Sequence, residues 1–192
     1  MGEEIRKHVR NPVIYGIERN SLGPVYSISQ IFKNIPDDDS ILVSYIDTLQ
    51  KTTLEKIIQD FSDCDSGLSV HDFKNPHWRT SNSYCLVKHN DSLEVNEVIE
   101  KFDFSYFDFT TPNAAGSSGN YYFSSGSLMK KAFNNLMRSS LTVNGEYYVT
   151  QAVGALSECG AKVKCSYYPY AALGVPEDLE NYEFWSKWFK GK

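Results

Sequence analysis

Asp47 is the residue whose type and position first indicate chemistry in this chain. It lies in the stretch 40–53, "SILVSYIDTLQKTT", where a carboxylate follows residues typical of a buried strand. Aspartate is a common turn residue, which is one explanation for its place. The other is that open α/β sheets carry ligand-binding groups at the carboxyl ends of their strands. The stretch alone leaves both explanations open.

Two further groups have residue types that could bind a ligand. Glu100 and Lys101 are adjacent at the end of an expected strand, and Asn144, Gly145 and Glu146 form a turn before an expected helix. Each group also has an ordinary explanation. A charged pair at a strand end is often only solvated, and a glutamate at a helix start stabilises the helix dipole.

The charge balance limits the class of ligand. The 192 residues include 19 Lys and Arg against 24 Asp and Glu, which gives a formal net charge of −5. A broad nucleic-acid-binding surface is therefore not expected. A small anion is still compatible with this balance, because one lysine and a helix N-terminus can hold a phosphate.

The cysteines and the hydropathy pattern predict a cytoplasmic protein. The four cysteines form no C-x-x-C pair and have no zinc-type spacing with histidine, so we expect buried, reduced thiols. No apolar run is long enough to cross a bilayer, and no signal-peptide pattern is present at the start. We expect no membrane insertion.

The first part of the chain predicts alternating strands and helices. Residues 12–18, "PVIYGIE", are typical of a strand, and Pro24 is suited to the first turn of a helix that ends near residue 35. A strand over 41–46 follows, and then a helix to Phe61 that Thr52 or Thr53 caps. This order predicts a parallel arrangement.

The remaining chain predicts a mixed sheet. Four segments are typical of strands separated by short turns, near 68–73, 83–88, 94–99 and 119–123. Helices are expected over 127–138 and 147–159, then a strand over 162–168 and an amphipathic helix from Pro176 toward Phe189. The predicted fold class is α/β, in one domain, with a mixed and mostly parallel central sheet flanked by helices.

Several motifs together resemble one family. They are, in chain order, "VSYIDT" (43–48), "HDFKNPHW" (71–78), "VIEK" (98–101), "AAGSSGNYYFSSGSLMKKAF" (114–133), "LTVNGEYYV" (141–149) and "LGVPEDLENYEFWSKWF" (173–189). Their order and spacing resemble the sugar-phosphate nucleotidyltransferases, which have a Rossmann-like fold. Within that family the chain looks most like the bacterial enzymes that make nucleotide-activated precursors for capsule and lipopolysaccharide. The resemblance covers nearly the whole chain, from about residue 12.

The resemblance implies a reaction and a metal. Enzymes of this family transfer a nucleoside monophosphate from an NTP to a sugar 1-phosphate, and pyrophosphate leaves. The attack is in line, and catalysis depends on positioning and on charge neutralisation by a divalent metal. Mg²⁺ needs few protein ligands, so a single carboxylate at a strand end can anchor it. The resemblance therefore implies that Asp47 is catalytic and binds the metal.

The resemblance also implies roles for the acceptor site. Glu100 would accept hydrogen bonds from sugar hydroxyls, and Lys101 would meet a phosphate, so Lys101 is expected to be both catalytic and substrate-binding. Asn144 and Glu146 would form the turn that recognises the sugar. Gly119 would bring backbone against the sugar, although a glycine in a strand otherwise suggests a bulge.

Three more residues have weaker assignments. Gly23 in "SLGPVYS" would lie beside the nucleotide base, because a missing side chain lets the backbone approach a flat ring; an ordinary Gly-Pro turn is the alternative. His77 is interpreted as a structural loop residue. Trp78 or a nearby tyrosine could stack on a ring, but such a residue is more often simply packed.

The chain departs from the family pattern in three places. No Gly-rich loop for the NTP phosphates occurs upstream of Asp47, so the first βα unit of the family is expected to be missing. Ala172 and Leu173 stand where many members carry a second metal-binding aspartate. No proline follows Lys101. These departures predict weaker metal binding and reduced activity.

One physical consequence and two rival functions remain. A truncated sheet would expose an apolar edge, so we expect self-association, a homo-oligomer or poor solubility. A non-catalytic module that binds sugar phosphates is a rival function. A nucleotide-sugar-dependent glycosyltransferase ranks last, because "TLQ" follows Asp47 and supplies no second carboxylate at the D-x-D spacing.

Overall fold

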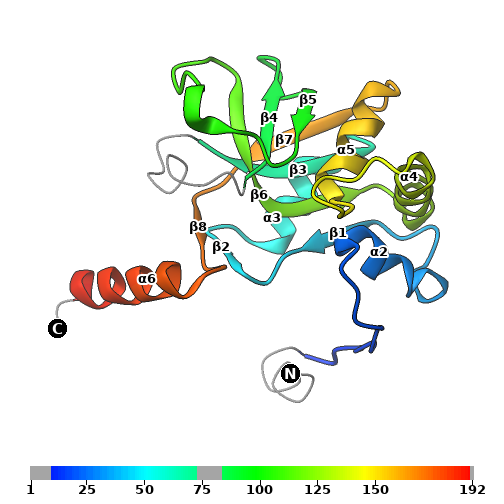
Figure 1. Ribbon diagram of the computed structural model, residues 1–192, viewed down its shortest axis with the longest axis horizontal. Coiled ribbons are helices and arrows are strands. Elements are labelled where there is room, and N and C mark those ends of the chain that lie inside the picture. The colour runs from blue at the N-terminus through cyan, green and yellow to red at the C-terminus, as the bar shows by residue number, and fades with distance from the viewer. Residues whose placement is uncertain (1–9, 73–83, 191–192) are drawn as a thin grey trace.

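A mixed sheet forms the centre of the molecule (Figure 1). The computed structural model describes residues 10–72 and 84–190. The elements are, in chain order, α2 (Gly23–Ser29), η1 (Phe32–Asn34), β1 (Ile41–Ser44), β2 (Thr48–Gln50), α3 (Leu54–Phe61), β3 (Ser66–His71), β4 (Leu86–His89), β5 (Val95–Ile99), η3 (Phe104–Tyr106), β6 (Ala114–Phe123), α4 (Gly126–Ser139), α5 (Val149–Glu158), β7 (Val163–Tyr167), β8 (Tyr170–Ala172) and α6 (Pro176–Phe189).

The pairing of the strands differs from a mostly parallel sheet. The described strands follow the order β5-β4-β6-β3-β7, and β1 pairs with the far end of the long strand β6. The pair β3–β7 is the only parallel one among them, and β1 lies antiparallel to β6 instead of parallel to β3. The α/β class with a mixed sheet flanked by helices is confirmed, whereas the prediction of mostly parallel pairing is wrong.

The expected first strand does not form. Residues 12–18 adopt no regular structure, and Val13 is 75% exposed. A strand needs a neighbour to accept and donate its backbone hydrogen bonds, and alternation of apolar residues does not provide one. Two strands of three residues, β2 and β8, were in turn not predicted, because segments this short have no periodic pattern.

Most of the predicted helices are confirmed, with local signals at their ends. Pro24 lies in the first turn of α2, which is shorter than expected and continues only as the 3₁₀ turn η1. Thr53 caps α3, where its hydroxyl accepts a hydrogen bond from the Lys56 amide at 3.2 Å. Gly160 adopts a φ of 82° just after α5, as a helix-terminating glycine does.

The main core lies between the sheet and the helices α2, α4 and α5. Its largest fully buried side chains include Phe123 on β6, Phe133 on α4 and Val153 on α5. Alternation along β6 separates the two faces of the sheet. Tyr121 and Phe123 belong to this core, whereas Tyr122 between them belongs to a smaller cluster on the other side.

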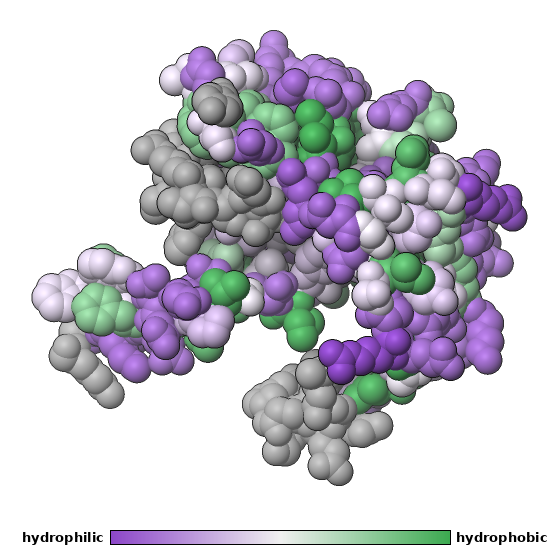
Figure 2. All heavy atoms as spheres, in the orientation of Figure 1, coloured by the Kyte–Doolittle hydropathy of each residue, from purple (hydrophilic) through white to green (hydrophobic). Residues whose placement is uncertain are grey.

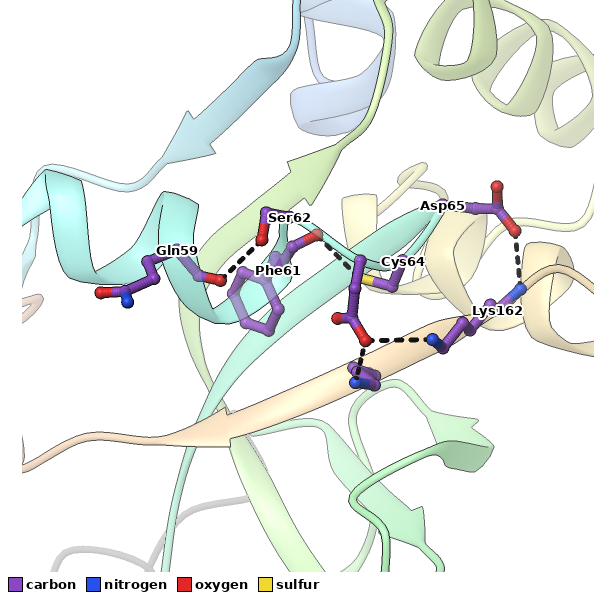
Figure 3. A network of polar contacts seen from close by, with 8 residues as sticks. Gln59, Phe61, Ser62, Cys64, Asp65 and Lys162 are labelled. Atoms are coloured by element: carbon purple, nitrogen blue, oxygen red, sulfur yellow. Dashed lines mark hydrogen bonds and ion pairs between the residues drawn. The ribbon is translucent and has the colours of Figure 1, made fainter.

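That smaller cluster packs α3 against the opposite face. Ile57 and Phe61 of α3 are buried there with Tyr122 and Tyr168. Figure 3 shows how the connection after α3 is fixed to the neighbouring strand β7.

The polar contacts in Figure 3 join the α3–β3 connection to the start of β7. Asp63 accepts hydrogen bonds from the ammonium groups of Lys162 and Lys164 at 3.0 and 2.7 Å, and these donors lower the pKa of its carboxyl to about 2. Asp65 accepts one from the Lys162 amide at 2.8 Å. These contacts align β3 and β7 as parallel neighbours.

The helix α6 lies apart from this packed body. Figures 1 and 2 show it extending away from the sheet, and no residue of α6 is buried. Large apolar side chains on it remain accessible, including Trp185 at 52% and Trp188 at 66%. The predicted helix is therefore present, but its large apolar side chains are not buried against the described part of the chain.

The cysteines follow the prediction in part. None of the four is in a disulfide; Cys64, Cys85 and Cys165 are buried, and Cys159 is exposed, which corrects the expectation that all four are buried. Cys159 ends α5 at the surface. Within residues 10–72 and 84–190, no helix is long and apolar enough to cross a membrane.

Candidate active site

A cavity of about 470 Å³ opens at the ends of several strands. Its walls come from the β1–β2 connection, the starts of β4 and α5, the residues after β5, the middle of β6, and the segment from β8 into α6. The two short strands β2 and β8 bring the first and last of these parts together. This position agrees with the rule that ligand sites of open sheets lie at strand ends.

Four of the predicted site residues line this one cavity. They are Asp47, Glu100, Lys101 and Gly119. Asp47 follows β1, Glu100 and Lys101 follow β5, and Gly119 lies within β6, so residues from three segments far apart in sequence meet in space. The sequence pattern alone could not establish this meeting, because it depends on the pairing of the strands.

Asp47 occupies the turn between β1 and β2 and is exposed. Its carbonyl oxygen accepts a hydrogen bond from the Leu173 amide at 2.8 Å, which fastens the turn to the chain beyond β8. A Cβ added at Gly174 would lie 3.1 Å from Oδ2 of Asp47. The missing side chain at Gly174 therefore leaves room beside the carboxylate.

This surrounding is compatible with Mg²⁺. The ion prefers one or two carboxylates and completes its shell with water and phosphate oxygens, which an open position beside Asp47 allows. Ala172 lines the cavity at the position where the resemblance led us to expect a second aspartate, and the described residues hold no group of three or more metal-ligating side chains. The residues present fit an ion that has one protein carboxylate and completes its shell with water or ligand oxygens.

Glu100 lies deeper and is chemically different from Asp47. Its carboxylate accepts a hydrogen bond from the Thr150 hydroxyl, and burial raises the pKa of Glu100 above its ordinary value. A carboxyl in such a place can accept a hydrogen bond from a ligand hydroxyl, because its lone pairs have little competition from water.

Lys101 is held in an uncommon conformation. Its φ of 51° is in the left-handed region, which a residue with a side chain adopts rarely. Its ammonium lies 5.2 Å from the centre of the Tyr148 ring. Strained backbone of this kind often accompanies a functional position, because the surrounding structure must enforce it.

Asn144 and Glu146 do not line the cavity. They belong to a tight turn in which Asn144 and Gly145 adopt φ values of 53° and 81°, and Val143 and Glu146 exchange two backbone hydrogen bonds of 3.0 Å. The Glu146 carboxylate accepts a hydrogen bond from the Tyr148 hydroxyl, and Tyr148 does line the cavity. Glu146 therefore binds a residue of the cavity wall, Tyr148, without lining the cavity itself.

Gly23 also lies outside the cavity wall and packs against this same turn. A Cβ at Gly23 would lie 2.8 Å from the carbonyl oxygen of Tyr147, and the φ of Gly23 is 86°. The neighbouring Leu22 carbonyl accepts a hydrogen bond from the Tyr147 amide at 2.9 Å. A structural reason for this glycine is thus present, and its place beside a nucleotide base stays a prediction.

Sequence reasoning did not assign the aromatic and acidic groups of the cavity. Tyr45, Tyr84, Tyr121, Tyr148 and Tyr170 all line it, and so does Asp178 from the first turn of α6. Burial raises the pKa of each tyrosine, so their hydroxyls stay protonated near neutral pH. Their proximity to motif residues was the available signal: Tyr45 precedes Asp47 by two positions, and Tyr148 follows the Asn144 turn.

The remaining prediction concerns two residues that the structure does not describe. His77 and Trp78 lie outside the described residues, and their assignments stay predictions.

Comparison with known proteins supports the same class of fold. No protein-family model matches the chain. The bifunctional protein GlmU of Marinobacter nauticus is 25% identical over 178 residues, which are 91% of this chain and 37% of that protein. The chain therefore spans little more than a third of the length of this relative.

Solved structures give a closer match in shape than in sequence. A nucleoside-diphosphate-sugar pyrophosphorylase from Vibrio cholerae superposes with a TM-score of 0.65 at 18% identity, over 86% of this chain and 66% of that one. A UDP-glucose pyrophosphorylase in complex with UDP-glucose gives a TM-score of 0.65 at 15% identity, over 88% of this chain and 64% of that one. The chain has the Rossmann-like fold of nucleotidyltransferases.

Proposed function

We propose that this chain transfers a nucleoside monophosphate from an NTP to a sugar 1-phosphate, or to a similar phosphorylated acceptor, with release of pyrophosphate. The observation that carries the proposal is the meeting of Asp47, Glu100, Lys101 and Gly119 around one cavity. The fold of the structural neighbours and the similarity to GlmU support the same class of reaction.

The proposed reaction balances without an oxidant or a further reactant. A phosphate oxygen of the acceptor attacks the α-phosphorus of the NTP, a phosphorus–oxygen bond forms, and the bond to the β-phosphate breaks. Pyrophosphate leaves with that electron pair. Asp47 would hold Mg²⁺, which supplies neutralisation of phosphate charge when it is bound.

The chain's own residues would position the acceptor. The Lys101 ammonium binds the acceptor phosphate as a point charge, and Glu100 accepts a hydrogen bond from a hydroxyl. Gly119 has no side chain and a φ of 90°, and it would contact the acceptor as part of the cavity wall. Glu146, with Asn144 in the same turn, acts on the acceptor through Tyr148, and Gly23 is assigned to the base-binding side.

A second candidate is a module that binds the acceptor without transferring a nucleotide. One observation favours it. Ala172 lines the cavity at the position where the resemblance led us to expect a second metal-binding aspartate, so a divalent ion would have one carboxylate fewer. A weaker metal site lowers the neutralisation of phosphate charge on which nucleotidyl transfer depends.

Calorimetric titration with four NTPs and a panel of sugar 1-phosphates, with and without Mg²⁺, separates these functions. We expect Mg²⁺-dependent NTP binding that is lost in Asp47→Ala and kept in Asp38→Ala, since Asp38 is an exposed aspartate outside the cavity. Pyrophosphate release should follow when both substrates are present. Sugar-phosphate binding without NTP binding would select the second candidate, and binding of neither ligand would contradict both.

Three further elements complete the proposal. A role in making surface-polysaccharide precursors rests on the resemblance, a cytoplasmic location rests on the cysteine and hydropathy patterns, and self-association of the chain rests on an exposed apolar sheet edge. Sedimentation velocity tests the last of these, and a monodisperse monomer would contradict it.

A further inference from the structure

A bulge in the sheet forms part of the cavity wall. The register of β3 on β6 shifts between Leu68 and Val70, so that Ser69 faces three residues of β6, 118–120. We call residues 118–120 the β6 bulge, and the first two of them line the cavity. Backbone groups in a bulge lack their usual partners in the ladder of the sheet. This part of the wall therefore depends on side chains for its hydrogen bonds.

The hydroxyl of Ser69 supplies hydrogen bonds to the β6 bulge. Ser69 is fully buried, and its Oγ accepts a hydrogen bond from the Asn120 amide at 3.1 Å and another from the Ser118 hydroxyl at 2.9 Å. The same hydroxyl donates to the Asn120 carbonyl at 3.4 Å. A buried polar group is costly unless it is paired, so Ser69 and the β6 bulge stabilise each other.

Gln50 of β2 joins the ribbon of β2 and β8 to the same place. Its Nε2 donates a hydrogen bond to the Ser118 carbonyl and a second one, at 3.1 Å, to Oγ of Ser69. Both acceptor residues are buried, so these hydrogen bonds have little competition from water. The ribbon lies between the sheet and α6 (Figure 1), and the three strands β2, β3 and β6 thus meet at one side-chain amide.

The contact between β2 and the β6 bulge affects where Asp47 lies. Thr48 and Gln50 are the two ends of β2, and Asp47 directly precedes this strand. A Cβ added at Gly119 would lie 3.3 Å from Cγ2 of Thr48, so β2 packs closely on the bulge at this end as well. A strand of this length spans only about 10 Å, so a shift at Gln50 would also move Asp47.

We propose that Gln50 is a positioning residue for Asp47. Its hydrogen bonds to Ser118 and Ser69 hold β2 on the β6 bulge, and this contact fixes the Asp47 carboxylate in the cavity. The inference rests on the proposed function, because that function assigns a metal and an NTP to Asp47. The effect of Gln50 on the ribbon can itself be measured without any ligand.

Hydrogen exchange tests whether Gln50 holds the ribbon. The Leu173 amide donates to the Asp47 carbonyl at 2.8 Å, so its exchange rate reports whether this end of the ribbon is closed. In Gln50→Met, which keeps the length of the side chain and removes its donors, we expect this amide to exchange at least tenfold faster. Amides of α5 should keep their rates, because α5 belongs to the main core. Gln59→Met, at an exposed glutamine of α3, is the matched control and should leave both rates unchanged.

A glutamate at the same position tests the hydrogen-bond donor itself. Gln50→Glu has the same shape as the natural residue but donates a hydrogen bond only when its carboxyl is protonated. Burial raises the pKa of such a carboxyl, so protection of the Leu173 amide should return as the pH falls from about 7 to about 5. Gln50→Met, measured at the same pH values, should show no such return, because it has no donor at any pH.

Titration calorimetry tests the consequence for ligand binding. In Gln50→Met we expect Mg²⁺-dependent NTP binding to weaken at least tenfold, because Asp47 is assigned to the metal. Sugar 1-phosphate binding should change less than twofold, since Glu100 and Lys101 come from the chain after β5. A general loss of structure would weaken both, so the split distinguishes positioning from stability. Gln59→Met should bind both ligands as the natural chain does.

The outcomes separate this inference from the proposed function. Equal exchange at Leu173 in Gln50→Met and Gln59→Met would overturn the inference, and so would faster exchange of every amide alike. Faster exchange at Leu173 with unchanged NTP binding would overturn the positioning of Asp47 and leave the proposed function standing. A natural chain that binds no NTP, with a ribbon that opens in Gln50→Met, would contradict the proposed function and support the role of Gln50 in holding the ribbon.

Discussion

The packed region, which consists of the sheet with α4 and α5, differs from α6 in how far its aromatic side chains are buried. Phe133 of α4 is fully buried, and it packs on Phe123 with ring centres 5.6 Å apart. Trp188 of α6 is 66% exposed, although both helices have 14 residues and α6 has five aromatic residues against one in α4. The number of large apolar residues in a helix does not determine whether they are buried. Their spacing along the helix does, because it places them on the one face that can pack against a sheet.

The largest expected effect is in the packed region. Phe133→Ala should lower the free energy of unfolding by about 3–5 kcal/mol, because it removes buried apolar area and leaves a cavity between α4 and the sheet. Urea unfolding followed by circular dichroism measures this. Phe184→Ala on α6, at a side chain that is 58% exposed, is the matched control. Equal losses in both variants would contradict the comparison.

His71 should make the packed region sensitive to acid. Its pKa is lowered from 6.5 to about 3 by burial, so below pH 6.5 the unfolded chain binds a proton that the folded chain does not. The contribution of neutral His71 to the free energy of unfolding is fully present above pH 6.5. It is lost as the pH falls toward 3, by about 1.4 kcal/mol per pH unit.

The contribution of His71 can be separated from that of the carboxyl groups. The difference in free energy of unfolding between the natural chain and His71→Phe, measured at pH 7 and pH 4, should shrink or reverse in favour of the variant at pH 4. A difference that does not change with pH would contradict a neutral, buried His71.

Gly23 should be sensitive to substitution because of its contact. Gly23→Ala places a Cβ 2.8 Å from the Tyr147 carbonyl at a φ of 86°, and should cost about 1–3 kcal/mol. Gly145→Ala has a φ of 81° but nothing within 4 Å, so it should cost only about 1 kcal/mol. Thermal unfolding of the pair isolates the clash from the strain, and equal losses would show that the clash contributes nothing.

The smallest effect is expected on α6. Trp188→Ala should change the free energy of unfolding by no more than about 0.5 kcal/mol, as exposed positions usually do. A loss near that of Phe133→Ala, or one that depends on protein concentration in sedimentation and unfolding experiments, would show that Trp188 is buried in an assembly and would change the comparison.

The sequence predicted those elements that have a period or a cap. Thr53, Pro24 and Gly160 mark helix ends by local chemistry, and the apolar spacing of α4 identifies the face that packs. The antiparallel pairing of β1 with β6 was not predictable from these signals, because strand partners are chosen by contacts far apart in sequence. The resemblance supplied Asp47, Glu100, Lys101 and Gly119, whose meeting depends on that pairing.

The residues that were missed have a common physical reason. Tyr84 and Tyr170 lie outside the motifs that support the resemblance, and the pairing of β2 with β8 brings Tyr170 and Asp178 near Asp47. For Asn144 and Gly23 the sequence indicated a local turn, but it did not indicate where the turn lies relative to the cavity. Neither residue lines the cavity, and Gly23 packs on Tyr147.

The pairing of β2 with β8 also affects the order in which parts of the structure form during folding. Asp47 enters the growing chain long before Leu173, yet the hydrogen bond between them fixes the turn that holds the carboxylate. Long-range contacts of this kind form late in folding, since loop closure must precede them. The candidate site would therefore form only after the sheet has assembled. A ligand that contacts both β2 and β8 would also stabilise this last part of the fold.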